Sequence, residues 1–260
     1  MINQLRADLF TQRHSTGFIV CLLAACGAAA AYLYLQHQLA LGGLNAAAAN
    51  GVQGLSDVMV INLLGSLLIG LIVSRPFETK SVHDALLASS RGSFVASKTV
   101  VAALAVFLLG VPYGIAALVG RATGLEVAPA VPTTFALLAE SGAEPDAAGV
   151  GRIIAVSVVA AILYAARLAV CIPLAIVVKR PIVVMAAGFV WAFVADLLVG
   201  AAAKWEALEA ITRLTPYAPD HLPLPDSSGG ELVGTSIVAV VFIALMGLVA
   251  WLLLRRADIK

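Results

Sequence analysis

"VMVINLLGSLLIGLIV" (58–73) and "TVVAALAVFLLGVPYGIAALVG" (99–120) contain no charged residue and are strongly apolar. A helix needs roughly 20 apolar residues to cross about 30 Å of hydrocarbon. Four further stretches of similar character occur elsewhere. We therefore predict an all-α polytopic membrane protein with six transmembrane helices, at approximately 17–35, 55–73, 99–120, 153–178, 182–203 and 232–254.

The composition of the whole chain favours the same fold class. Of its 260 residues, 61% are hydrophobic and 12% are charged, whereas soluble domains have roughly 45–50% and about 25%. No repeat with a period of roughly 20–50 residues is visible, so we expect a single transmembrane domain over residues 1–260. Within the spans, Pro112 and Pro173 predict kinks, and Gly65 with Ser66 predicts a close helix contact.

Positive charges divide unequally between the two sides of the membrane that these spans define. If both termini are cytoplasmic, the inner segments contain eleven Lys and Arg residues and the outer segments contain four. The inner residues are Arg6, Arg13, Arg75, Lys80, Arg91, Lys98, Lys179, Arg180, Arg255, Arg256 and Lys260, and the outer ones are Arg121, Arg152, Lys204 and Arg213. Because cytoplasmic loops are enriched in Lys and Arg, we predict that both termini face the cytoplasm.

Residues 1–15 predict a helix that lies along the inner membrane surface. Leu5 and Leu9 recur at helical spacing, and Phe10 widens their apolar face. Polar residues, Asp8 among them, are expected on the other faces of this helix. Such a pattern is typical of an amphipathic interfacial helix that binds the lipid bilayer, although a solvated leader is the alternative.

Two outer segments are long enough to have structure of their own. Residues 121–151 contain three prolines among acidic residues and predict a mostly irregular extracellular loop. Residues 204–231 begin with helix formers and place Trp205 and Leu208 on one apolar face, before Pro216 ends the helix. A tryptophan at the start of such a face indicates an interfacial or re-entrant helix. The alternative is an extracellular helix packed on the preceding outer loop.

The sequence contains no motif of a catalytic or metal site. G-x-S-x-G, H-E-x-x-H and C-x-x-C are absent, and the four histidines fall at or beyond the ends of the predicted spans. G-x-x-x-x-G-K-[ST] is also absent, so any ATP that drives this protein must be hydrolysed by another chain. The cations are not gathered with aromatic residues, which argues against nucleic-acid binding. We predict no catalytic residue, metal or cofactor in this chain, and no enzyme activity.

Two charged residues, Arg167 and Asp196, lie within predicted spans. An unpaired charge at that depth costs from roughly 2.5 kcal/mol upward, so both should face the bundle interior or a wet cavity. Their offset along the membrane normal, at about 1.5 Å per residue, is on the order of 10 Å. An extended arginine covers much of that distance, so we expect a structural pair, or neutralisation by backbone carbonyls and water. The alternative is a substrate or proton pathway.

The inner segment 74–98, between the second and third spans, predicts a short helix of its own. Ser81 and Asp84 have the capping-box spacing, which marks a helix start. Gly92 is expected to end this helix, and Ser93 to cap the third span. The segment is therefore more elaborate than a simple connection.

The short helix also has an apolar face, formed by Val82, Leu86 and Leu87. A helix of two turns is marginal alone in water, so it must be held by another surface. Three surfaces qualify: the lipid headgroups, the inner ends of the bundle, and another protein. The four cations of the segment favour the headgroups, and the choice stays open at this point.

The segment resembles the loop after the second span in ABC-2-type permeases, the membrane subunits of bacterial ABC exporters. The residues that carry the resemblance are Glu78, Ser81-Val82, Leu86-Leu87, Ser90-Arg91, Phe94 and Lys98. The N-terminal LRADLF (5–10), six spans with both ends inside, LTPYAPDHL (214–222) before the last span and the basic LLRRADIK ending (253–260) are also similar to that family.

This resemblance implies a permease subunit in the bacterial cytoplasmic membrane, working with a second permease copy or a homologous chain. It implies that segment 74–98 is a cytoplasmic coupling loop whose helix docks on a separate ATPase that binds ATP and magnesium. The coupling residues would be Glu78, Val82, Leu86, Leu87 and Arg91. Export of a lipophilic or peptide-like substrate is the expected activity, and the alternative is a secondary transporter or channel that uses the intramembrane charges.

Overall fold

The computed structural model describes residues 2–45, 47–128, 135–136, 138, 147–224 and 226–256, and in that part of the chain it contains helices and no strand. The helices are α1 (Ile2–Arg13), α2 (Thr16–Ala40), α3 (Ala48–Gln53), α4 (Asp57–Ile69), α5 (Arg75–Glu78), α6 (Val82–Ala88), α7 (Arg91–Ala122), α9 (Ala147–Leu168), α10 (Cys171–Val178), α11 (Pro181–Ala202), α12 (Glu206–Thr212) and α13 (Gly229–Arg256). A π-helical turn η1 (Gly70–Ser74) and a 3-10 turn η2 (Pro219–His221) complete the set.

Six helical stretches among the described residues are long and apolar enough to cross a membrane, which confirms the predicted number. They are Thr16–Ala40, Ala48–Glu78, Arg91–Ala122, Ala148–Val178, Pro181–Ala202 and Gly229–Arg256. The third begins at Arg91, well before the predicted start near 99. The backbone hydrogen bonds of a helix do not depend on apolar side chains, so the helix extends beyond the apolar residues from which the span was predicted.

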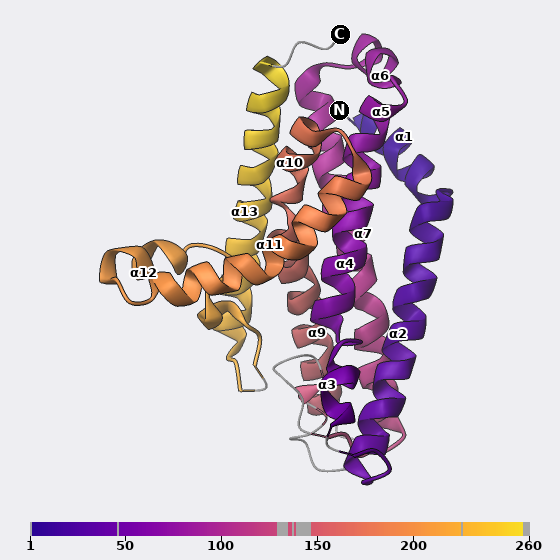
Figure 1. Cartoon of the computed structure of the whole chain (residues 1–260), viewed down its shortest axis with the longest axis vertical. Coiled ribbons are helices and arrows are strands. Elements are labelled where there is room, and N and C mark those ends of the chain that lie inside the picture. Colours follow the sequence, from indigo (N-terminus) through magenta and orange to yellow (C-terminus); the bar gives the residue numbers. More distant parts are fainter. Residues whose placement is uncertain are drawn as a thin grey trace.

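Helix α7 lies at the centre of the bundle, where it packs against α1, α2, α4, α9 and α13 (Figure 1). Small residues let the neighbouring helices approach closely. A Cβ atom at Gly65 of α4 would lie 2.6 Å from the Leu168 Cδ1 atom. The adjacent Ser66 hydroxyl donates a hydrogen bond of 3.2 Å to the Met185 carbonyl of α11. The close helix contact predicted at Gly65 and Ser66 is therefore confirmed.

Gly110→Ala tests how tightly α7 and α9 pack. A Cβ atom at Gly110 would lie 2.7 Å from the Ala161 Cβ atom and 3.3 Å from its Cα atom, so neither helix can yield by turning a flexible side chain. We expect a loss of about 1–3 kcal/mol in the free energy of unfolding. The matched control is Gly27→Ala in α2, where nothing lies within 4 Å. SDS-induced unfolding followed by circular dichroism should leave the control unchanged or stabilised, and equal losses in both variants would contradict this packing.

Two interruptions of regular helix adjoin each other through α10, which packs against η1. One is η1, and the other is the break between α9 and α10 at Ala169 and Val170. Pro173 explains the break, because a proline ring clashes with the carbonyl four residues earlier, here that of Ala169. The Ser74 hydroxyl of η1 donates a hydrogen bond of 3.1 Å to the Ala175 carbonyl of α10. The kink predicted at Pro173 is thus a true break, whereas α7 continues through Pro112.

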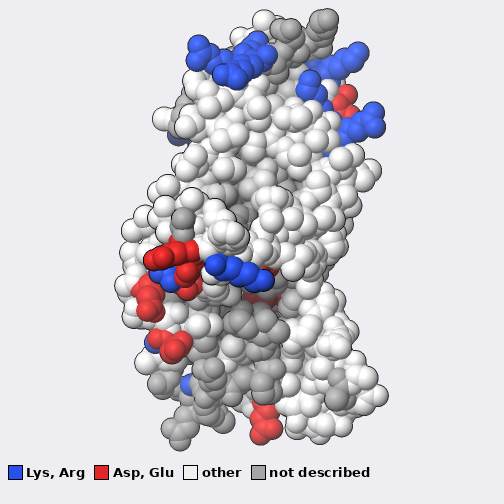
Figure 2. Space-filling view, turned by 60° about the vertical axis from the view of Figure 1, so that its left-hand side comes forward, with Lys and Arg blue, Asp and Glu red and all other residues white. Residues whose placement is uncertain are grey.

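Lys and Arg side chains gather at one end of the bundle, and most acidic side chains of this face lie lower, with some Lys and Arg among them (Figure 2). We call the cationic end the basic end. It carries α1, α5, α6 and the end of α13 (Figure 1). This separation of charge is the one on which the cytoplasmic orientation of the termini was predicted.

Helix α11 crosses the bundle obliquely and packs on α4, and its later part projects from the bundle together with α12 (Figure 1). Leu197 of α11, together with Trp205 and Leu214 at the two ends of α12, is 69–75% exposed. The helix predicted in 204–231 is present as α12, and its apolar face is exposed. Of the outer loop predicted at 121–151, residues 129–134, 137 and 139–146 lie outside the described residues.

Candidate functional site at the basic end

The start of the helix predicted in segment 74–98 agrees with the structure, but its capping does not. Helix α6 begins at Val82, directly after Ser81. The Ser81 hydroxyl makes no capping hydrogen bond and lies 3.0 Å from the Thr79 hydroxyl instead. Its backbone is already helical (φ −72°, ψ −5°), whereas a capping serine needs an extended backbone to reach the amides ahead of it.

The predicted end of this helix and the predicted cap of the next one are wrong. Ser89 has an extended backbone that ends α6, and Gly92 lies inside α7. The N-cap of α7 is Ser90, whose hydroxyl accepts a hydrogen bond of 3.2 Å from the Ser93 amide. Ser93 is thus the residue that is capped. A serine three residues before a free helical amide satisfies that donor, so no glycine is needed at the junction.

The five residues predicted to couple the chain to an ATPase fall into three groups. Val82 is only 3% exposed and Leu86 is half-buried, so both attach α6 to the bundle. Leu87 is 88% exposed, and Glu78 at the end of α5 is exposed as well. Arg91 donates from Nη1 to the carbonyls of Leu254 and Arg255, at 3.0 Å each. It therefore caps the end of α13 in this structure.

Helix α1 is attached to the bundle through a polar contact that the sequence analysis missed. Asp8 forms an ion pair of 2.9 Å with the Lys98 ammonium. It also accepts a hydrogen bond of 2.6 Å from the Ser97 hydroxyl. Both charged side chains are largely buried, at 11% and 13% exposure. Asp8 was expected on an outer face, but it follows Leu5 by three residues and precedes Leu9, so it shares their packed face. That spacing was the available signal.

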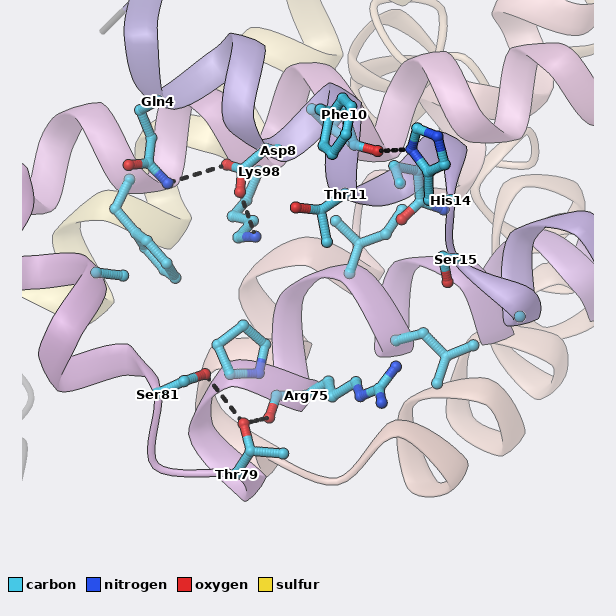
Figure 3. Close-up of a pocket in the computed structure, with 18 of the residues that line it drawn as sticks. Gln4, Asp8, Phe10, Thr11, His14, Ser15, Arg75, Thr79, Ser81 and Lys98 are labelled. Carbon is cyan, nitrogen blue, oxygen red and sulfur yellow. Dashed lines mark hydrogen bonds and ion pairs between the residues drawn. The ribbon is translucent and has the colours of Figure 1, made fainter.

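A cavity of about 810 Å³ separates α1 from α5 at the basic end (Figure 3). We call it the α1–α5 cavity. Helix α1 and the start of α2 form one wall, and residues 71–81 with part of α7 form the other. Thr79 and Ser81 line it from the segment that leads into α6, so the cavity adjoins the predicted coupling helix.

Within the membrane-spanning part, the structure brings Arg167 and Asp196 together. The Arg167 Nη2 atom lies 3.3 Å from the Asp196 Oδ1 atom. The same guanidinium donates from Nε to the Pro216 carbonyl at 3.0 Å and from Nη2 to the Tyr217 carbonyl at 3.4 Å. The Arg167 side chain is 13% exposed and that of Asp196 is 57% exposed. Arg167 therefore ties α9 to the segment between α12 and α13.

Tyr217 completes this tie. Its hydroxyl donates to the Arg167 carbonyl and accepts a hydrogen bond of 2.8 Å from the Trp191 indole. Burial raises the pKa of Tyr217, so the phenol stays protonated at neutral pH and keeps its donor. Four elements, α9, α11, α13 and the segment before α13, meet at this ring, because Phe242 of α13 also packs on it edge to face.

A further charge within the bundle, Asp57, was missed by the sequence analysis. It is the first residue of α4 and only 1% exposed, and it accepts a hydrogen bond of 3.0 Å from the Tyr164 hydroxyl. Nearby, the Tyr113 hydroxyl donates to the Leu55 carbonyl at 2.8 Å. Asp57 lies inside the predicted span 55–73, so the sequence already indicated an ionisable side chain at membrane depth there.

The part of the chain that the structure describes contains no group of three or more His, Cys, Asp or Glu side chains that could hold a metal ion.

Comparisons of the chain with protein-family models, with curated proteins and with solved structures find no match. The function must therefore be argued from the residues themselves.

Proposed function

We propose that this chain is the permease subunit of an ATP-driven ABC exporter in a bacterial cytoplasmic membrane. Helix α6 would dock on a separate ATPase subunit, which binds ATP and magnesium. Three features support the proposal: six spans, a short helix between the second and third spans at the basic end, and a sequence without a phosphate-binding motif of its own.

The observation that carries the proposal is the exposure of Leu87. A helix of two turns does not persist in water without support, and Val82 and Leu86 already provide that support by packing on the bundle. Leu87, at 88% exposure, has no role in holding the helix in place. An exposed leucine on a helix that is fixed from behind is suited to fill a pocket of a partner.

The surroundings of Leu87 favour a protein partner over lipid headgroups. Helix α6 lies at the extreme of the basic end, farther out than α1 (Figure 1). Exposed charges of both signs flank it, with Glu78 and Asp84 beside Lys80. An anionic lipid surface attracts cations alone, whereas a protein groove can complement both signs.

A second permease copy, or a homologous chain, would enclose the pathway with this one. Helices α11 and α13 are the least buried of the six spans within the described part of the chain. In the most apolar stretch of each, 17% of the residues are buried. Their exposed faces suit lipid or a second chain, and their apolar character fits a lipophilic or peptide-like substrate.

A secondary transporter or channel that works through Arg167 and Asp196 is the alternative. It has weaker support, because the Arg167 donors are directed at the carbonyls of Pro216 and Tyr217 as well as at Asp196. A residue that holds three groups in place is suited to a structural role, whereas a pathway needs a charge that can exchange partners.

Site-specific photocrosslinking tests the proposed docking. A photoreactive residue is placed at position 87 and, as a control, at Leu198, which is 55% exposed on α11. In native membranes, position 87 should crosslink to a subunit that contains an ATP-binding P-loop, identified by mass spectrometry, and position 198 should not. Transport by the purified chain in proteoliposomes, with an ion gradient and without an ATPase, would show the proposal to be wrong.

A further inference from the structure

We propose that the α1–α5 cavity binds the phosphodiester of an anionic phospholipid. At about 810 Å³ it has room for a headgroup and its glycerol. It opens between α1 and α5 at the basic end, where Lys and Arg side chains gather (Figures 2 and 3). Basic pockets between the cytoplasmic ends of transmembrane helices are suited to bind lipid headgroups. The site is independent of the docking of α6.

The cavity has one uncompensated cation, Arg75. Its two other charges are Asp8 and Lys98, which neutralise each other across 2.9 Å. The Arg75 side chain extends from α5 into the space beneath α1 (Figure 3), and no acidic side chain of the described residues pairs with it. A guanidinium presents its donors in a fork that matches two phosphate oxygens.

The start of α2 adds donors at the same cavity. Ser15 is the N-cap of this helix, yet its hydroxyl makes no capping hydrogen bond. Thr16 and Gly17 also line the cavity, and as the first two residues of α2 they have amides without a carbonyl partner within the helix. Because the helix dipole places positive charge at this end, it favours an anion beside Arg75.

The other part of the lining is apolar, which favours a lipid over free phosphate. Leu71, Ile72, Phe94 and Val101 contribute to the walls. Phe10, which also lines the cavity, is 67% exposed on α1, as expected of a side chain that rests among lipids. An inorganic phosphate ion would use the donors and leave the apolar walls in contact with water. A phospholipid uses both.

Native mass spectrometry of the full chain tests the site. The protein is purified in detergent with phosphatidylglycerol or phosphatidylcholine, and the retained lipid is counted. We expect one phosphatidylglycerol to be retained in preference to phosphatidylcholine, and Arg75→Gln to weaken its binding about fivefold. The matched control is Arg6→Gln, which removes an exposed cation of α1 that does not line the cavity. Equal weakening in both variants would overturn the proposal, because it would indicate attraction by surface charge alone.

Two further measurements separate the sources of the phosphate group and guard against misfolding. Inorganic phosphate at millimolar concentration should not displace phosphatidylglycerol, and displacement would overturn the lipid assignment. Arg75→Lys keeps the positive charge but lacks the forked donors of a guanidinium. Its affinity for phosphatidylglycerol should therefore lie between those of the wild type and Arg75→Gln. The melting temperatures of the Arg75 variants should match that of Arg6→Gln, because Arg75 pairs with no described acid. If Arg75→Gln keeps full phosphatidylglycerol binding, the site is wrong.

Discussion

Replacing Leu87 with arginine should abolish co-purification of the partner ATPase, with a loss of about tenfold or more in the amount recovered. Central apolar anchors of interfaces are often worth 2 kcal/mol or more, and each 1.4 kcal/mol is a factor of about ten in affinity. Because Leu87 is 88% exposed, the change should not alter the folding of the permease itself. The matched control is His83→Arg, which adds the same cation to an exposed position of α6 and removes no leucine.

The structure decides which of the two adjacent leucines is the sharper test. The sequence alone treats Leu86 and Leu87 alike, but Leu86 packs against the bundle and an arginine there would loosen α6. A loss of ATPase in Leu86→Arg could therefore reflect either misplacement of the helix or loss of the contact. Recovery of the ATPase with Leu87→Arg at the level of His83→Arg would show that α6 does not dock through this face.

The second large effect is expected at Arg167. Arg167→Leu removes the donors to the Pro216 and Tyr217 carbonyls together with the partner of Asp196. Buried carbonyls left without a donor cost about 1–3 kcal/mol each, so we expect a loss of about 2–4 kcal/mol in the free energy of unfolding. Asp196→Asn should cost less than about 1 kcal/mol, because Asp196 is 57% exposed and asparagine still accepts a hydrogen bond.

SDS-induced unfolding, followed by circular dichroism, measures both variants under one condition. A large difference between Arg167→Leu and Asp196→Asn supports Arg167 as a tie for the segment before α13. Equal losses in the free energy of unfolding would mean that Arg167 stabilises the fold mainly through its ion pair with Asp196. The hydrogen bonds to the two carbonyls would then contribute little. Near-zero losses in both variants, with transport abolished, would favour the alternative in which these charges form a pathway.

The number and approximate positions of the spans could be predicted from the sequence, because the length of apolar helix that a bilayer requires is a local property. The start of α6 was predicted at the right residue, but the capping box on which the prediction depended does not form. The tilt of α11 was not predictable. It brings Asp196 to Arg167, although their positions along straight spans predicted an offset on the order of 10 Å.

The contacts at the basic end depend on which helices are neighbours, and no short stretch of sequence contains that information. Asp8 and Lys98 are separated by 90 positions. Arg91 and Leu254 are separated by 163. The spacing of Asp8 from Leu5 indicates a packed face, but the sequence cannot show that its partner is Lys98 or that Arg91 caps a distant helix. Which residues of a short helix face a partner is therefore decided by its packing on the bundle.

The turn η1 packs against α10, which begins directly after the break at Ala169 and Val170, so the two irregular segments adjoin. Long helices bend most readily where the regular hydrogen-bond ladder is interrupted, so we expect the second and fourth spans to share a hinge here. Ser74 and Ala175 join the two sides of the hinge, and the close approach of Gly70 to Pro181 adds the start of α11. A tilt of α5 would therefore move α10 and α11 with it as one mechanical unit.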